Sequence, residues 1–353
     1  MRASSALRPR LTAFIILAGV TETVSVIVQQ AFKDRFFPTD AQAAQLAKTF
    51  GCARSVSNRA LEFRATAWRQ EKNSIGSPLT SANLTDWKKE PENAFLSEGS
   101  SVTLQPSLRH LEVAFPNFFE QRSQDPAFKS KHGRPSAHSA PNAFTERDGR
   151  ITLAKPSEPL DIGGSRPLPD DATLVHLTVR RDPSGRDLVR LLVEPDVQPL
   201  RKAKAEVGRD VGIKTLATTS DGERLENPRP LIRREKRWKR LQRRLSRKGK
   251  GGNHRKKARL QVARLHARIS DTRRDTLQKF TTKIIRENQA IVVEGLRVAG
   301  RGKNPNLAKP IADAAFGEIF RELASKAGGW GRTSVDLDRF VPSSKWRSSC
   351  GPL

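Results

Sequence analysis

The sequence predicts a chain of several domains that mixes α+β and α/β organisation. Its 353 residues are enough for two or three domains. The spacing of apolar residues changes along the chain, from a helical period to an alternating one and then to a mixture of both. A dense block of positive charge interrupts the third region. These observations indicate helical, β-rich and mixed regions in that order.

Positive charge is the most informative property of the composition. The chain has 65 Lys and Arg residues against 37 acidic residues, which gives a formal net charge of +28. Residues 233–286 alone contain 22 Lys and Arg residues and three acidic residues. Such a segment repels itself unless phosphate groups neutralise it. The charge therefore indicates a nucleic-acid partner.

Residues 1–30 are expected to be an extra segment outside the fold. The apolar run Leu11–Val20 follows several arginines and has the outline of a signal peptide. Glu22 interrupts the apolar stretch that follows, and no small-residue cleavage site is present, which argues against export and against a membrane span. The chain has two cysteines, which is too few for a disulfide framework and fits a reducing cytosol.

Helices are expected over residues 32–121. Thr39 and Asp40 provide a capping signal, and small and large apolar residues then follow helical spacing. A second helix is expected over residues 104–120. Cys52 lies in the first helix and is interpreted as a small buried thiol.

A small antiparallel sheet or barrel is expected over residues 128–197. Three segments, which include residues 174–182 and 187–195, alternate or are rich in β-formers. The sequence Asp-Pro-Ser-Gly at 182–185 predicts a turn between the last two.

A basic loop precedes this sheet and suggests phosphate contacts. Its cations are Lys129, Lys131 and Arg134. His132 and His138 have a spacing that could suit a metal ligand pair. No Cys-x-x-Cys motif accompanies them, so zinc is not expected here.

Strands and helices alternate from Glu206 onward. Residues 206–227 predict three strands, with Asp221-Gly222 as the turn between the second and third. Another buried strand ends at Glu294, and residues 333–340 predict a further strand. A single helix is expected from Ile311 to Ala327, followed by two glycines that stop it.

The basic block is expected to form an antiparallel helical hairpin over residues 230–288. One apolar stripe centres on Leu241 and a second on Leu265, and a glycine-rich segment separates them. The remaining faces carry Lys and Arg. Nucleic-acid contacts are expected from Arg237, Arg240, Arg243, Arg244, Arg247, Lys248, Arg255, Lys256 and Lys257.

Two carboxylates lie where the pattern predicts strands. A charge at Asp210 is costly unless it is paired or bound to a metal. If its strand neighbours the strand that ends at Glu294, the two carboxylates can converge and hold Mg²⁺. Such ions stabilise the attacking and leaving oxygens of a phosphodiester. The alternative, that both are ordinary acids at strand ends, stays open at this point.

Several motifs stand in a definite order along the chain. In the N-terminal half these are AFKDRFFPTDAQ, TFGCARSVSN and FKSKHGR. In the C-terminal half they are VGRDVGIKTLATTSDGERLENP, the basic hairpin sequence, IVVEGLRV, IADAAFGEIFRELASKAGGWG and DRFVPSSK with SSCG. With these motifs in this order, the chain resembles the OrfB/TnpB insertion-sequence transposase family over residues 32–351.

The resemblance implies an RNA-guided DNA endonuclease, with guide RNA and DNA as partners and neither a membrane nor a small-molecule substrate. It implies a β-barrel domain over residues 31–200 with a helical recognition region inserted at about 40–125. An RNase H-like (RuvC-like) domain over residues 205–341, containing the hairpin, would follow. The implied location is the prokaryotic cytoplasm, in association with the nucleoid.

The resemblance also assigns the two carboxylates. Asp210 and Glu294 match the first two of three catalytic acids, which implies bound Mg²⁺ in an active protein. In the family the third acid follows a four-cysteine zinc ribbon, and no segment of this sequence matches it. Asp336 and Asp338 are poor substitutes, because a displaced carboxylate seldom preserves a two-ion geometry.

Residues 342–353 are interpreted as the remnant of that zinc ribbon in a C-terminally truncated chain. Cys350 matches one zinc ligand, but Arg347 occupies the position of the ligand before it. A structural zinc site needs four ligands, so Zn²⁺ is not expected to bind.

Three interpretations remain. The chain is a working guided nuclease, a guide-RNA- and DNA-binding remnant or repressor that does not cleave, or a generic basic RNA-binding protein. The missing third acid favours an impaired nuclease. The ordered set of motifs argues against the generic protein, and the sequence has no hydrolase, Walker A or dinucleotide motif.

Overall fold

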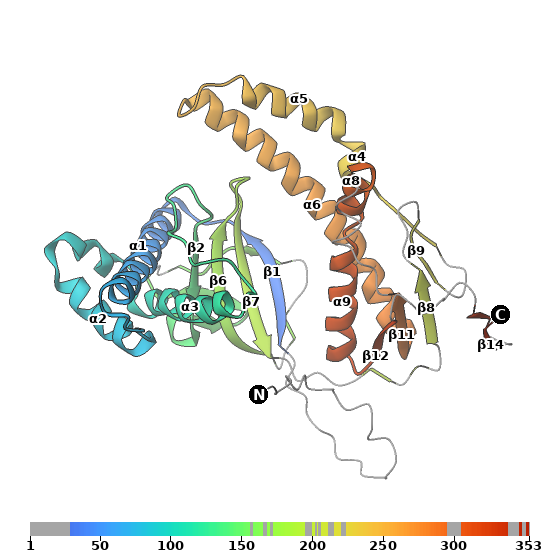
Figure 1. Ribbon diagram of the computed structural model, residues 1–353, viewed down its shortest axis with the longest axis horizontal. Coiled ribbons are helices and arrows are strands. Elements are labelled where there is room, and N and C mark those ends of the chain that lie inside the picture. The colour runs from blue at the N-terminus through green and yellow to red at the C-terminus, as the bar shows by residue number, and fades with distance from the viewer. Residues whose placement is uncertain are drawn as a thin grey trace, which may run out of the picture.

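Two β-sheets, each with its own helices, form the body of the molecule, and a helical hairpin projects from it (Figure 1). The computed structural model describes residues 29–155, 158–164, 168–169, 172–194, 200–201, 203, 206–210, 215–219, 224–294, 305–337, 346–347 and 351–352. For residues 77, 206, 208–210, 293–294, 305–307, 336–337, 346–347 and 351–352 only the backbone is described. Residues 1–28, the turn at 221–222, Asp338 and Cys350 lie outside the described residues.

The first sheet has five antiparallel strands in the order β2-β6-β7-β1-β5. Their bounds are β1 Gln30–Phe36, β2 Ser136–Ser139, β5 Ile162–Gly163, β6 Thr173–Arg181 and β7 Asp187–Glu194. The predicted antiparallel sheet is confirmed. The edge strands β2 and β5 have four and two residues, and no pairing between them is seen among the described residues, so the expected barrel is not observed there.

Strand β1 corrects the prediction of a helical start at residue 32. Phe32 and Phe36 are buried at alternating positions, as expected for a strand with one face on a core. The helical period begins only after Thr39.

The helical region lies between β1 and β2, as expected. It comprises α1 Asp40–Glu71, α2 Ser77–Lys89, the 3₁₀ helix η1 Pro91–Glu98 and α3 Ser101–Phe119. Thr39 caps α1 through a capping box, in which the Gln42 amide donates to Thr39 Oγ1 (3.3 Å) and the Thr39 amide donates to Gln42 Oε1 (3.1 Å). The prediction that Cys52 is a buried thiol is confirmed, because only 2% of it is exposed.

A separate core fills the space beneath the first sheet. It combines the inward residues of the strands with Leu46 and Phe50 of α1 and with the hairpin of β3 (Phe144–Arg147) and β4 (Arg150–Leu153). The helices α1, α2 and α3 bury a second core between themselves.

The second sheet has the order β10-β9-β8-β11-β12. Its strands are β8 Glu206–Asp210, β9 Thr215–Thr219, β10 Arg224–Glu226, β11 Ala290–Glu294 and β12 Thr333–Leu337. The pairs β10–β9 and β9–β8 are antiparallel, whereas β8–β11 and β11–β12 are parallel. Val207 and Ile291 of this sheet pack against Ile284 and Leu323 of the helices.

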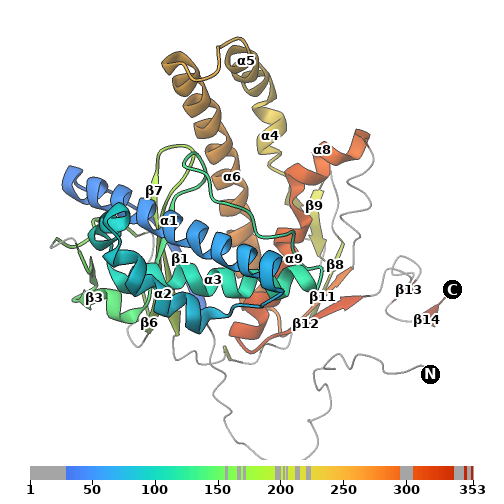
Figure 2. The same ribbon diagram turned by 60° about the vertical axis from the view of Figure 1, so that its left-hand side comes forward.

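The basic helical hairpin is present as predicted. It consists of the short α4 Pro230–Arg233, α5 Glu235–Ser246 and α6 Asn253–Glu287. The two apolar stripes meet around Leu241 and Leu265, and the Trp238 indole donates to His266 Nε2 (3.0 Å) across the pair. Helix α6 runs from the hairpin tip down to the second sheet (Figures 1 and 2).

The prediction of a single helix over residues 311–327 is wrong. The chain forms α8 Pro305–Ala314 and α9 Phe316–Gly329, and Ala315 between them has a left-handed backbone with φ of 54°. The break lets Asp313 and Phe316 both be buried. Near the C-terminus, β13 Trp346–Arg347 pairs with β14 Gly351–Pro352.

None of the helices in the described ranges is long and apolar enough to cross a membrane.

The glycines of the helical region provide a test of this packing. Gly51 lies inside α1, and a Cβ there would meet no atom within 4 Å. Gly51→Ala is therefore expected to stabilise the protein by about 0.5–1 kcal/mol through helix propensity. Gly99→Ala is the contrast, because its Cβ would lie 3.2 Å from that of Cys52 and against buried Leu104. Thermal unfolding should show a higher Tm for the first variant and a lower one for the second.

Candidate nucleic-acid interface and metal centre

The two predicted acids end neighbouring strands. β8 and β11 pair in parallel, with Arg209 level with Val293. Asp210 and Glu294 are the next residues and the last of their strands. The carboxyl ends of parallel strands lie at one edge of a sheet, where ligands of α/β proteins bind. The backbone thus places both residues side by side at that edge. The structure describes only the backbone at these two positions.

Asp336 does not share this position. It is level with Val293, and Leu337 is the residue of β12 that pairs with Glu294. Asp338 and Cys350 lie outside the described residues. Within the described side chains, which do not include Asp210 and Glu294, no group of three or more His, Cys, Asp or Glu residues could hold a metal ion.

A buried carboxylate attaches the hairpin to the second sheet domain. The side chain of Asp313, from α8, accepts hydrogen bonds from the backbone amides of Leu231 (3.0 Å) and Ile232 (3.2 Å) at the start of α4. Arg273 of α6 forms an ion pair with it at 3.2 Å and also donates to its backbone oxygen. One residue thus joins α4, α6 and α8.

Most of the predicted hairpin cations are exposed and available to a ligand. The exposed ones are Arg237, Arg240, Arg243, Arg244, Arg247, Lys248, Lys256 and Lys257. Arg255 differs, because it donates to the backbone oxygens of Leu245 (3.1 Å) and Lys248 (2.7 Å) at the end of α5. In this structure Arg255 satisfies free carbonyls at a helix terminus, and its assignment as a phosphate contact stays a prediction.

The basic loop before β2 presents its three cations to solvent. Lys129, Lys131 and Arg134 are all exposed. Reciprocal hydrogen bonds attach this loop to α1, since Asn58 Nδ2 donates to the Lys129 carbonyl (3.0 Å) and Asn58 Oδ1 accepts from its amide (2.7 Å). Desolvation by neighbouring protein atoms lowers the pKa of Lys129, although the residue is in contact with solvent.

The two histidines near this loop do not act together. His132 is exposed in the loop, whereas His138 of β2 packs against the His110 ring, with centroids 4.1 Å apart. Nδ1 of His138 lies 3.0 Å from Thr178 Oγ1. Burial, with further contributions from His110 and Lys129, lowers the pKa of His138 to about 4.

A second group of cations lies between the first sheet and α6. The sequence pattern did not predict it. Lys33 of β1 is paired with Arg190 of β7, and desolvation, followed by the charges of Arg274 and Arg180, lowers the pKa of Lys33 to about 8. Like charges on directly opposed strand residues are destabilising. The signal in the sequence was weak, because these cations are scattered over three strands and one helix.

An ion pair connects this region to the hairpin. Arg186, in the β6–β7 turn, forms ion pairs with Asp182 (2.9 Å) and with Asp271 of α6 (2.6 Å). The first sheet and the basic hairpin are therefore held beside each other, with cations on both.

Comparisons with known proteins identify the family. Residues 188–304 match a family model described as "Probable transposase" (OrfB_IS605), and residues 28–73 match one described as "Helix-turn-helix domain". A protein of Streptomyces pristinaespiralis named "Putative RNA-guided DNA endonuclease" is 50% identical over 327 residues, which cover 92% of this chain and 81% of the relative. The chain belongs to the OrfB/IS605 transposase family.

Two further proteins are similar to this chain at lower sequence identity. The Escherichia coli (strain K12) relative InsQ, with the same descriptive name, is 31% identical over 84% of this chain and 77% of its own length. A Cas12f1–sgRNA–target DNA complex contains a chain that is 11% identical with a TM-score of 0.47, covering 93% of this chain and 92% of that one. The segment matched as a helix-turn-helix forms strand β1 and the long helix α1 here.

The anchoring role of Asp313 can be tested by unfolding. Asp313→Ala leaves Arg273 and two helix-terminal amides without their buried partner, so we expect a loss of about 3–5 kcal/mol. Asp275→Ala in α6 removes an exposed i,i+4 pair with Lys279 and should cost less than about 0.5 kcal/mol. Urea titration followed by tryptophan fluorescence measures both, and equal losses would contradict the anchoring role.

Variants of Arg255 and Arg244 distinguish an effect on stability from an effect on nucleic-acid binding. Arg255→Gln is expected to lower the stability of the hairpin by about 1 kcal/mol, because two carbonyls lose a charged donor. Arg244→Gln should leave stability unchanged but reduce the salt slope of nucleic-acid binding by about one unit. Thermal unfolding and filter binding over a range of salt concentrations distinguish the two. A reversed pattern would show that the assignments are wrong.

Proposed function

We propose that this chain binds a guide RNA together with the DNA that pairs with it, as an RNA-guided DNA endonuclease of the transposase family whose cleavage is impaired. The observation that carries the proposal is the position of Asp210 and Glu294 at the adjacent ends of β8 and β11. The names of the relatives, which cover most of the chain, support the same activity.

The second sheet belongs, in this proposal, to an RNase H-like nuclease domain over residues 205–341. Residues 31–200 form the N-terminal domain, with a helical recognition region at about 40–125. Support comes from the mixed sheet, whose parallel strands carry both acids at their carboxyl ends. The hairpin at 230–288 is an insertion between strands of that sheet.

Asp210 and Glu294 would hold Mg²⁺ in an active centre. Carboxylates are the hard oxygen donors that this ion prefers. When bound, it would neutralise charge on the attacking and leaving oxygens of the phosphodiester. The residues of this chain supply the negative charge that attracts the ion and the strand framework that fixes where it sits.

The exposed cations of the hairpin and the group of cations around Lys33 would bind the phosphate backbone. A guided protein holds its heteroduplex by backbone and shape, and base pairing reads the sequence. The repulsion of Lys33 by Arg274 and Arg180 would be relieved by such a polyanion. Phosphate beside Lys33 would also raise its pKa from about 8.

Cleavage by the 353-residue chain is expected to be impaired. None of its sequence matches the third acid of the family motif, and Asp336 is not level with Glu294. The second candidate function is therefore binding of guide RNA and DNA without cleavage, as a repressor.

A nuclease assay separates the two functions. We expect the chain with its guide RNA to bind target DNA at low salt but to cut it no faster than Asp210→Ala does, with or without Mg²⁺. Mg²⁺-dependent cutting that Asp210→Ala and Glu294→Gln both abolish would instead establish a working nuclease. Loss of binding at low salt would contradict both functions, and cutting that survives Asp210→Ala would remove Asp210 from the centre.

A further inference from the structure

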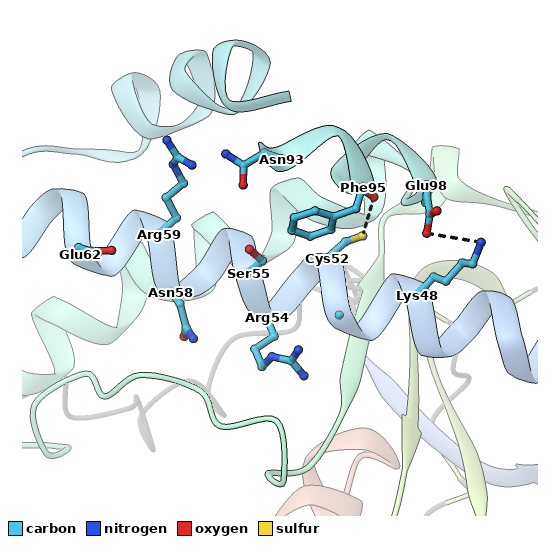
Figure 3. A pocket seen from close by; sticks show the side chains of 11 residues that line it. Lys48, Cys52, Arg54, Ser55, Asn58, Arg59, Glu62, Asn93, Phe95 and Glu98 are labelled. Carbon is cyan, nitrogen blue, oxygen red and sulfur yellow. Dashed lines mark hydrogen bonds and ion pairs between the residues drawn. The ribbon is translucent and has the colours of Figure 1, made fainter. Parts of the chain in front are cut away.

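A cavity of about 570 Å³ lies on helix α1, apart from the acids and the hairpin. Its walls are one face of α1, including Gly51, Arg54 and Asn58, and the 3₁₀ helix η1 with Asn93 and Phe95 (Figure 3). This volume is within the range of pockets that bind small ligands. The cavity is open to solvent and is lined by both charged and aromatic side chains.

Gly51 forms the floor of this cavity. A Cβ at this position would meet no atom within 4 Å. Glycine weakens a helix interior relative to alanine, and packing within the protein does not require it here. The bare backbone therefore leaves room for a ligand to lie against α1.

Arg54 supplies an available positive charge. Two other cations at the rim are engaged, since Lys48 pairs with Glu98 (3.5 Å) and Arg59 with Glu90 (2.6 Å). Arg54 is half-buried and forms no ion pair or hydrogen bond with any described residue. Its guanidinium can therefore bind an anionic group, most effectively a phosphate.

Phe95 and Asn93 supply an aromatic face and a hydrogen-bonding edge. The Phe95 residue is 42% exposed, and its backbone is held by the Cys52 thiol, which donates to its carbonyl (3.3 Å). Asn93 uses its Nδ2 to donate to Glu90 (2.7 Å), and its Oδ1 accepts no hydrogen bond from the described residues. Stacking on an aromatic ring combined with amide hydrogen bonds is how proteins recognise unpaired bases.

The basic loop continues from one end of the cavity. Asn58, which lines it, exchanges two hydrogen bonds with the backbone of Lys129. Cations of the loop therefore stand next to the cavity, where the phosphates of adjoining nucleotides would pass. A single strand of nucleic acid would contact both the cavity and the basic loop, whereas a free nucleotide would contact the cavity alone.

We propose that this cavity binds one unpaired nucleotide of a single-stranded segment of the bound nucleic acid. The base stacks on Phe95 and meets Asn93, a phosphate pairs with Arg54, and the strand continues past Lys129. The inference rests on the proposed nucleic-acid function and adds a site to it.

Fluorescence of 2-aminopurine tests the site. The full chain is titrated with short single-stranded RNA and DNA that carry the probe, and stacking on Phe95 should quench it. Phe95→Ala should remove the quenching and weaken binding by about fivefold or more. Gly51→Leu should have the same effect by filling the cavity, with Tm unchanged or raised because leucine is a good helix former.

Matched controls lie outside the cavity. Phe119→Ala removes another exposed aromatic residue, on α3, and Arg69→Gln removes another exposed cation on α1. Both should leave the quenching unchanged, whereas Arg54→Gln should reduce affinity and salt dependence.

The outcomes separate this inference from the proposed function. Binding by the wild type that neither Phe95→Ala nor Gly51→Leu alters would overturn the cavity site and leave the proposed function intact. Absence of any binding by the wild type would overturn both. A titration with adenosine monophosphate is the third measurement. If it bound with an affinity that depends on Phe95 while oligonucleotides failed to displace it, the site would belong to a free nucleotide and the inference would be wrong.

Discussion

The buried carboxylate of Asp313 holds three helices together beside the second sheet. It takes the amides that begin α4 and the guanidinium of Arg273 in α6 as partners, in a site with almost no exposure to solvent. A charge in such a place is stable only with these partners, so the three helices are defined relative to one another. The hairpin cations and the strand ends then occupy set positions on one framework.

Much of the fold follows from local patterns in the sequence. The capping box at Thr39, the apolar stripes around Leu241 and Leu265, and the antiparallel strands are short-range signals, and the structure has them where they were expected. The strand at residues 30–36 was missed because its two buried phenylalanines, Phe32 and Phe36, are four apart and fit a helix as well as a strand.

Other features depend on contacts between distant residues, which spacing does not encode. The break at Ala315 exists because Asp313 and Phe316 must both reach buried partners. Arg255 reads as one more cation in a basic run, yet its neighbours across the turn make it a helix cap. The cluster around Lys33 requires strands and a helix from both halves of the chain. Asp210 lies beside Glu294 because β8 and β11 are neighbours in the sheet. Local sequence patterns do not encode this strand order, so they predict the pairing only if the two strands are adjacent.

Helix α6 has a mechanical consequence. Its 35 residues are continuous from the glycine-rich turn to Glu287, a length of roughly 50 Å. The first half, whose charged residues are all basic, and the second half, which contributes apolar residues to the core, belong to one rod, whose lower end packs with Ile284 and Ile285 in the core beneath β11. Among the described residues, the ion pairs of this rod nearest the tip that tie it to the two sheet regions are made by Asp271 and Arg273, which pair with Arg186 and Asp313. A strand drawn across the hairpin tip would therefore load these two ion pairs before the core beneath the sheet.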